Sequence, residues 1–195
     1  QFPTGMANKQ SLQDFAGTYA RNSGPLVNLP SVPYVFDNCT ELTSIRLYGA
    51  SGISGSRFPI FTNPKLRTLD VRFTGIRGGS PDGDDSNVIS SNTFGQAVEL
   101  STILIDSSSL LTTPIDPNAF ANLQQLSYIW YRSYGRTGGG VPNFNGNPEL
   151  TRIYMEFNAF TGTAPNLSSN TKIYSIDLRR NKLSGTIPAY KNLAN

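Results

Sequence analysis

The sequence predicts an α/β-type repeat solenoid, in which the short strands of successive coils pair into one parallel sheet. Two observations lead to this prediction. One apolar spacing recurs six times along the 195 residues, and within each copy the apolar residues alternate with others, as a strand with one buried face requires. A single coil cannot bury its own apolar face, so the copies are expected to stack on one another.

The clearest copies begin at Leu66, Leu150 and Ile173 and align without a gap. In the last of them Asn181 follows the alternating apolar residues, and Pro188 closes the copy fifteen residues after its start. An asparagine side chain can satisfy backbone groups where the chain turns a corner, and proline shapes the path back. Each copy is therefore expected to contain a strand, a corner and a return segment.

Three further copies begin at Leu42, Leu100 and Leu126, so that successive starts are separated by 24, 34, 26, 24 and 23 residues. The 34-residue step indicates an insertion. Most of these copies lack asparagine at the corner; in one of them Tyr134 stands there instead. We expect an irregular corner in such copies.

Two regions follow from this spacing. Residues 1–35 are predicted to form a degenerate N-terminal repeat or a cap-like segment, because Phe15 and Pro30 show the same fifteen-residue offset. Residues 36–195 are predicted to form an array of about six repeats, with an insertion loop at 80–95 and a continuation beyond the chain end.

Four segments carry a resemblance to known repeats. The segment 181–188, Asn-Lys-Leu-Ser-Gly-Thr-Ile-Pro, resembles the plant-specific class of leucine-rich repeat, and 160–165 resembles a looser copy. The segments 36–45 and 119–126 resemble BspA-like repeats of bacterial surface proteins. The resemblance covers roughly residues 36–195. It implies a right-handed leucine-rich-repeat coil, with a short-stranded parallel sheet on the concave face and a mostly irregular or 3-10 convex side. It also implies an extracellular or cell-surface location.

In the resembled repeat, the residues between the apolar strand positions face the concave side. On the strands of the coils that begin at Leu126 and Leu150, most of these residues are aromatic or arginine, and Trp130, the only tryptophan, is expected to be exposed. Exposed aromatic residues beside arginine are typical of binding hot spots. The predicted partner-binding residues are Tyr128, Trp130, Arg132, Arg152, Tyr154, Glu156, Phe157 and Arg179.

A second interpretation of the same residues stays open. Cross-strand aromatic pairs and arginines stacked on rings stabilise a sheet without any ligand. The aromatic positions are therefore compatible with a partner surface and with a plain sheet surface.

The composition argues against catalysis. The chain contains no histidine, which removes the commonest general base and the Ser-His-Asp triad. Cys39, the only cysteine, is expected to be a buried structural thiol rather than a nucleophile. Carboxylates on the concave side, such as Asp70 and Asp106, are expected to form salt bridges rather than the acid pair of a glycosidase. We therefore predict no enzyme and no cofactor.

The insertion contains a weak candidate for a calcium site. Its carboxylate and amide oxygens are hard ligands, but the glycine and glutamate of an EF-hand loop are absent at the required offsets, so a solvated acidic turn is the simpler interpretation. The candidate ligands are Asp82, Asp84, Asp85 and Asn87.

The charge and hydropathy patterns limit the classes of partner. The net charge of +3 comes without a run of lysine or arginine, which gives no indication of nucleic-acid binding. No stretch of about 18 apolar residues occurs, so no transmembrane segment is predicted in this chain.

The function that these features favour is non-catalytic protein–protein recognition through the concave sheet of an extracellular or surface-located protein. A second hypothesis is a carbohydrate-binding or adhesive module of a bacterial adhesin or a phage host-attachment protein, with Trp130 and Tyr154 stacking on glycan rings. A third is a structural component of a virion or surface assembly. None of these patterns predicts the oligomeric state.

Overall fold

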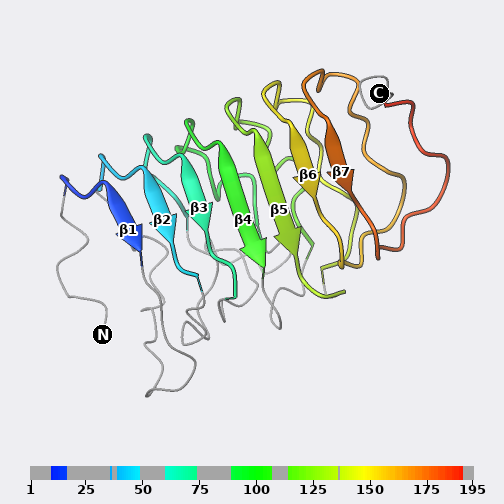
Figure 1. The fold of residues 1–195 in the computed structure, drawn as a ribbon, viewed down its shortest axis with the longest axis horizontal. Helices are drawn as coiled ribbons and strands as arrows, with labels where there is room; N and C mark the ends of the chain where they lie inside the picture. Colours follow the sequence, from blue (N-terminus) through cyan, green and yellow to red (C-terminus); the bar gives the residue numbers. More distant parts are fainter. Residues whose placement is uncertain are drawn as a thin grey trace, which may run out of the picture.

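The computed structural model describes residues 10–16, 36, 39–48, 60–73, 89–106, 114–135 and 137–190. Its strands form one seven-stranded parallel sheet, and their order in space is their order in the sequence (Figure 1). Over these residues the connections are turns and irregular segments, without an α-helix or a 3-10 helix. The predicted repeat solenoid is confirmed. The strands are β1 (Asp14–Ala16), β2 (Ser44–Arg46), β3 (Thr68–Asp70), β4 (Thr102–Asp106), β5 (Tyr128–Arg132), β6 (Arg152–Tyr154) and β7 (Ser175–Asp177).

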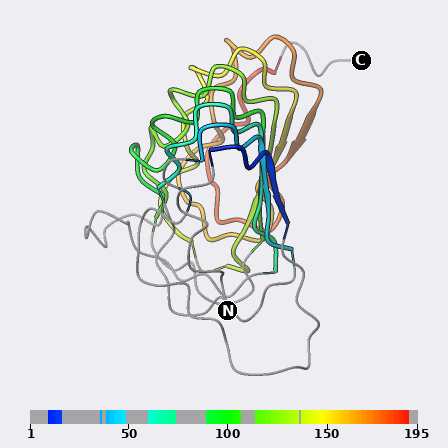
Figure 2. The same ribbon diagram turned by 90° about the vertical axis from the view of Figure 1, so that its left-hand side faces the viewer.

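Equivalent residues of successive copies lie side by side in the sheet. Ile129 on β5 pairs with Ile153 on β6, and Ile153 pairs in turn with Ile176 on β7. Ile129 and Ile153 are fully buried inside the coils. Viewed from the end, the coils superimpose with their strands along one side (Figure 2). The alternation predicted for the strands therefore holds, and the residues between the buried positions form the outer face of the sheet.

The first strand, β1, pairs in parallel with β2 and precedes the six copies predicted from the sequence. Phe15 pairs with Ile45 on β2, and its ring centroid lies 5.2 Å from that of Phe36. Phe15 thus aligns with the fourth position of the copy that begins at Leu42, and Leu12 aligns with Leu42 itself. Strand pairing decides the register, because a shift would turn the apolar face away from the core. The division of the chain at residue 36 stays a prediction.

A column of phenylalanine rings runs through the segments that precede the strands. The ring centroids of Phe61 and Phe94 lie 5.8 Å apart, with ring planes at 9°. Phe120 continues the column at 5.9 Å and 25° from Phe94, and Phe144 follows it at 5.9 Å and 6°. These four rings are at most 1% exposed. They form a continuous aromatic core across four coils.

Part of the predicted insertion loop, 80–95, packs within a regular coil. Ile89 forms a parallel bridge with Ile115, and Phe94 belongs to the phenylalanine column. Residues 80–88 lie outside the described residues, and with them the calcium candidates Asp82, Asp84, Asp85 and Asn87.

Asparagine side chains tie neighbouring coils together at the predicted corner. The Nδ2 of Asn158 donates to the carbonyl oxygens of Tyr131 and Met155, both at 3.0 Å. The Nδ2 of Asn181 donates to the carbonyl oxygens of Met155 at 2.8 Å and Leu178 at 2.9 Å. Each amide satisfies one carbonyl of its own coil and one of the coil before it, as the sequence pattern predicts for a corner.

A second set of asparagines stands three residues before the strand-containing segments begin. Asn147 is fully buried, and its Nδ2 donates to the carbonyl oxygens of Phe120 and Leu123, both at 2.8 Å. Asn63 makes the same pair of bonds to Phe36 and Cys39, at 2.9 and 3.1 Å. Cys39 is itself fully buried, in agreement with the expected structural thiol. This second ladder fixes the spacing of the coils on their return side.

Candidate functional site

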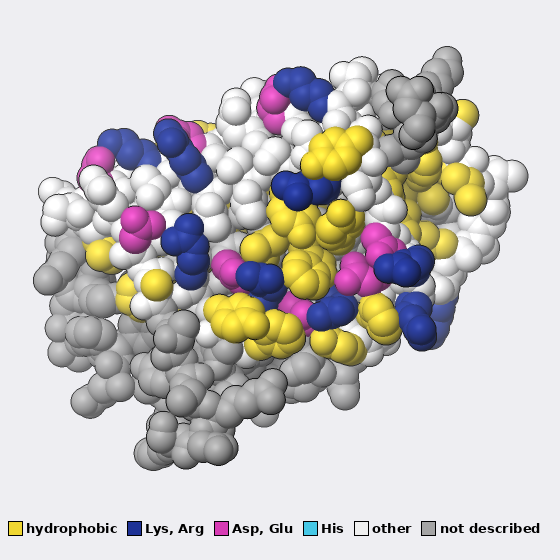
Figure 3. All heavy atoms as spheres, viewed as in Figure 1, with side chains coloured by type: hydrophobic (Ala, Val, Ile, Leu, Met, Phe, Trp, Pro, Cys, Tyr) yellow, Lys and Arg dark blue, Asp and Glu magenta, His cyan; other side chains and the backbone are white. Residues whose placement is uncertain are grey.

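The residues predicted for partner binding on β5 and β6 come together on the outer face of the sheet. Tyr128 pairs with Arg152 and Trp130 pairs with Tyr154 across the two strands. Figure 3 shows apolar side chains gathered near the middle of this face, with basic and acidic side chains among and around them. We call the following set the aromatic patch: Arg72, Tyr128, Trp130, Arg132, Tyr134, Arg152, Tyr154, Glu156 and Phe157.

The tyrosines of the patch meet edge to face. The ring centroids of Tyr128 and Tyr154 lie 5.6 Å apart with ring planes at 83°, a favourable aromatic geometry. The guanidinium carbon of Arg152 lies 4.4 Å from the Tyr128 centroid. The Oγ of Ser175 donates to the Tyr154 hydroxyl at 3.1 Å. Burial is the main cause that raises the pKa of the Tyr128 hydroxyl, so this phenol stays neutral at physiological pH.

Trp130 is half-buried rather than exposed, which corrects the sequence expectation. The guanidinium carbons of Arg72 and Arg132 each lie 5.3 Å from its ring centroid. Its Nε1 is buried and has no hydrogen-bond partner among the described residues. The physical reason is long-range, because Arg72 follows β3, two strands away in the sheet.

Arginines of the outer face hold its carboxylates, as the sequence predicts for Asp70 and Asp106. Arg72 pairs with Asp70 at 2.6 Å. Arg132 bridges two strands, because it pairs with Asp106 on β4 and lies 3.7 Å from Glu156 after β6. The hydrogen bond to Asp106 is the main cause that raises the pKa of Arg132. These carboxylates are engaged by cations rather than free to act as an acid–base pair.

Arg179 lies at the margin of the site. It pairs with Asp177 at 2.7 Å, and its side chain is 82% exposed. The hydrogen bond from Arg179 lowers the pKa of the Asp177 carboxyl. Of the eight predicted residues, Arg179 and Glu156 have no described contact with a ring of the patch, and Glu156 reaches the patch through Arg132.

The rim beyond the strand ends is built from residues with left-handed backbone conformation. Phe73, Tyr134, Phe157 and Arg180 have φ values of 56°, 54°, 59° and 57°. Such a conformation costs a non-glycine residue about 1 kcal/mol or more. Because it recurs in several coils, it is a property of the corner. The left-handed conformation presents the Tyr134 and Phe157 rings at the end of the sheet, close to Arg132. The guanidinium carbon of Arg132 lies 4.9 Å from the Tyr134 ring centroid and 5.8 Å from the Phe157 ring centroid.

The predicted set does not include Arg72, Tyr134 or Arg180. Arg72 has a signal in the sequence, because it occupies the same column of the repeat as Arg132. Tyr134 stands where other copies carry the corner asparagine, which conceals its role as a surface ring. Arg180 lies 4.9 Å from the Phe157 ring centroid, at a position that only the corner conformation brings to this face.

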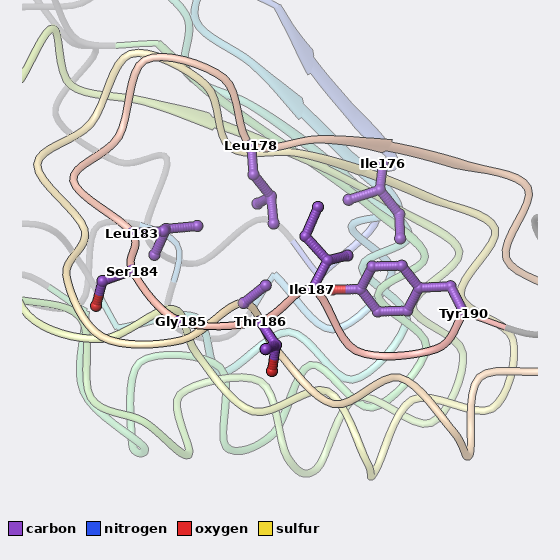
Figure 4. A pocket seen from close by; sticks show the side chains of 9 residues that line it. Ile176, Leu178, Leu183, Ser184, Gly185, Thr186, Ile187 and Tyr190 are labelled. Atoms are coloured by element: carbon purple, nitrogen blue, oxygen red, sulfur yellow. The ribbon is translucent and has the colours of Figure 1, made fainter.

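A separate apolar hollow of about 400 Å³ lies on the last described coil (Figure 4). Ile176, Leu178 and Leu183 line it together with Ile187, which is 81% exposed. Ile176 and Leu178 are only partly buried, whereas their counterparts Ile153 and Met155 are fully buried. The hollow is therefore the side of the core that the next coil covers elsewhere in the stack.

Two further properties concern the described residues only. They contain no group of three or more histidine, cysteine or acidic side chains that could hold a metal ion. They also contain no helix with the length and apolarity needed to cross a membrane.

Comparison with known proteins gives one curated relative and several structures. No family model matches the chain. The chain is 29% identical over 134 residues to receptor-like protein 41 of Arabidopsis thaliana; the match covers 69% of this chain and 14% of the relative. The chain therefore spans a small part of that protein's length.

Two solved structures are similar at low identity. One is the leucine-rich-repeat ectodomain of the plant membrane receptor kinase GASSHO1/SCHENGEN3 from Arabidopsis thaliana, in complex with CASPARIAN STRIP INTEGRITY FACTOR 2. It is 20% identical with a TM-score of 0.32, over 92% of this chain and 28% of that one. The other is an internalin from Listeria monocytogenes, 12% identical with a TM-score of 0.34, over 97% of this chain and 61% of that one.

Proposed function

We propose that this chain, a leucine-rich-repeat protein by its repeat, its parallel solenoid and its receptor-like relative, is a non-catalytic module that binds another protein through the concave outer face of its sheet. The observation that carries the proposal is the aromatic patch. It joins half-buried aromatic rings and arginines on adjacent strands, which are the residue types that dominate binding hot spots. We further propose an extracellular or cell-surface setting, which the receptor-like relative supports.

The alternative of a plain sheet surface is opposed by the polar atoms of the patch. Nine buried side-chain nitrogen or oxygen atoms have no hydrogen-bond partner among the described residues, and five of them lie in or directly beside the patch. A surface that only stabilises a sheet gains nothing from such a concentration, because each unsatisfied buried group is destabilising. The five atoms are Asp106 Oδ1, Trp130 Nε1, Arg132 Nε, Arg152 Nε and Glu156 Oε2.

The ring contacts favour a protein partner over a glycan. A sugar ring stacks on a free aromatic face, but the π surface of Trp130 already has two guanidinium groups near it. Tyr128 has Arg152 over its ring and Tyr154 against it edge to face. The patch combines aromatic rings with guanidinium groups, which suit the mixed apolar and polar side chains of a protein.

The experiment compares the proteins retained by immobilised wild-type chain and by matched variants. Trp130→Ala with Tyr154→Ala removes the centre of the patch. Tyr174→Ala is the control, because Tyr174 is 63% exposed and lies outside the patch. Circular dichroism and thermal unfolding establish that each variant is folded. We expect bound proteins that persist on Tyr174→Ala and are lost on the double variant. An identical set of proteins on all three chains would contradict the proposal.

A further inference from the structure

The charged pairs in and beside the patch lie at two levels. Asp106, Asp70 and Asp177 have side chains that are 0%, 9% and 19% exposed. Their arginine partners are more exposed in each pair, at 18% for Arg132 and 24% for Arg72, and Arg179 is the most open. In these three pairs the carboxylates lie beneath guanidinium groups, and the charge that a partner meets first there is positive.

Two arginines have no carboxylate partner among the described residues. Arg152 lies over the Tyr128 ring at 4.4 Å, and its Nε is without a hydrogen bond. Arg180 is exposed and lies over the Phe157 ring at 4.9 Å. Stacking on a ring holds a guanidinium in one orientation while its in-plane N–H donors stay available for an anion.

Arg152 belongs to the patch and begins β6, whereas Arg180 lies at the margin of the patch, three residues after the end of β7. Arg152 pairs across the sheet with Ser175, and Arg180 follows Ser175 by five residues. At about 3.3 Å per extended residue, the two positions are at most roughly 16 Å apart along the strand direction. Tyr154 and Phe157 follow Arg152 along β6 and the corner after it, and the Arg180 guanidinium lies over the Phe157 ring. A ligand that reaches both cations must therefore cross aromatic surface on the way.

We propose that the aromatic patch recognises an extended, acidic polypeptide segment, with carboxylates at Arg152 and Arg180 and apolar side chains between them. This inference rests on the proposed function and adds the chemistry of the partner. A planar guanidinium binds a carboxylate through two parallel hydrogen bonds, which gives a defined orientation as well as charge attraction. A polypeptide is favoured over a sulfated glycan because the surface between the two cations is aromatic and offers no further unpaired cation in the described residues.

The test selects ligands from random sequences, so the natural partner need not be identified beforehand. A phage-displayed library of random 12-residue peptides is selected on the folded chain, and the enriched peptides are synthesised and titrated by fluorescence polarisation. We expect enrichment of aspartate and glutamate together with apolar residues. Arg180→Gln should weaken binding about tenfold, and affinity should fall as salt is raised, because exposed charges steer association. Arg152→Gln should weaken binding as well.

The matched control is Lys182→Gln, which removes the same unit of charge two residues from Arg180 at an exposed side chain outside the patch. It should change affinity less than twofold. Arg180 is exposed, so Arg180→Gln keeps the test valid if Arg152→Gln fails to fold. A heparin fragment serves as the second probe.

The outcomes separate the two proposals. Neutral or basic peptides whose binding is lost on Trp130→Ala would overturn the acidic partner and leave the proposed function standing. Peptides whose affinity changes on neither Trp130→Ala nor Arg180→Gln would overturn both the proposed function and the acidic partner. Heparin bound through Arg180, with no acidic peptide enriched, would overturn the polypeptide class. If Arg180→Gln and Lys182→Gln lowered peptide affinity equally, the effect would come from net charge alone, and the inference would be overturned.

Discussion

The molecule contains two aromatic regions built on different principles. In the phenylalanine column, rings stack almost parallel, at 9° and 6° in two of its three contacts, and they are at most 1% exposed. In the aromatic patch, Tyr128 and Tyr154 meet at 83°, and Tyr134 and Phe157 at 44°. The patch rings alternate with arginines and stay partly open to solvent.

The difference shows what each region can contribute. A buried, uniform ring column stabilises the stack of coils through apolar burial and close packing. The patch buries polar atoms that have no hydrogen-bond partner among the described residues, and it carries partly exposed arginines, which lowers its value for stability and suits it to a partner. Substitutions in the column should therefore act on folding, and substitutions of the patch rings mainly on binding.

The largest expected effect is in the column. Phe120→Ala removes a fully buried ring that stacks on Phe94 and Phe144. Loss of a buried phenylalanine destabilises a protein by about 4 kcal/mol, because transfer energy and a cavity add together. Urea denaturation followed by circular dichroism measures the change. A loss of unfolding free energy below about 1 kcal/mol would contradict the structural role of the phenylalanine column.

The next effect concerns the ion pair beneath the patch. Arg132→Ala leaves the carboxylate of Asp106, which is 0% exposed, without its cation. Removing one partner of a buried pair is expected to cost about 3 kcal/mol. The double variant Arg132→Ala with Asp106→Asn should recover part of this loss in the same unfolding experiment. If both variants were equally stable, the buried charge would not be the cause.

An intermediate effect is expected in the second asparagine ladder. Asn147→Ala leaves the carbonyls of Phe120 and Leu123 without their side-chain donor, at a cost of about 2 kcal/mol. Asn145→Ala is the control, because Asn145 is exposed two residues away. The difference between their unfolding free energies measures the ladder, and equal values would show that the ladder is dispensable.

These predictions also mark how far the sequence alone determines the structure. The strand register and the corner asparagines follow from local patterns, because a strand alternates its faces and an amide satisfies a turning backbone. The phenylalanine column has a signal of the same kind, since Phe94, Phe120 and Phe144 each stand six residues before the first apolar position of their copy. These residues lie outside the strand motif, so a pattern built on the strands does not predict the column.

Other features have no local pattern. The half-burial of Trp130 depends on Arg72, which follows a strand two positions away in the sheet. The left-handed conformation of Phe157 and Arg180 opposes the intrinsic preference of such residues, so tertiary context imposes it. The pairing of arginines with carboxylates follows from columns of the repeat, but their two levels of exposure do not.

The smallest effect in the series is acid sensitivity at the margin of the patch. Hydrogen bonding from Arg179 lowers the pKa of Asp177 in the folded chain. A group with a lowered folded pKa contributes stability above its unfolded pKa and loses it as the pH falls through the folded value. Wild type should therefore lose more stability than Asp177→Asn as the pH falls from about 4 to about 2. If the unfolding free energies of wild type and Asp177→Asn fell in parallel with pH, the Arg179–Asp177 pair would contribute nothing to stability.

The central claim is that the aromatic patch exists for binding rather than for holding the sheet together. The most direct measurement is the unfolding free energy of Trp130→Ala relative to that of Phe120→Ala, determined under identical conditions. Trp130 is half-buried beside unsatisfied polar atoms, so its loss should be less than half of the loss for Phe120. A loss as large as that of Phe120→Ala would make Trp130 a structural residue and contradict the account.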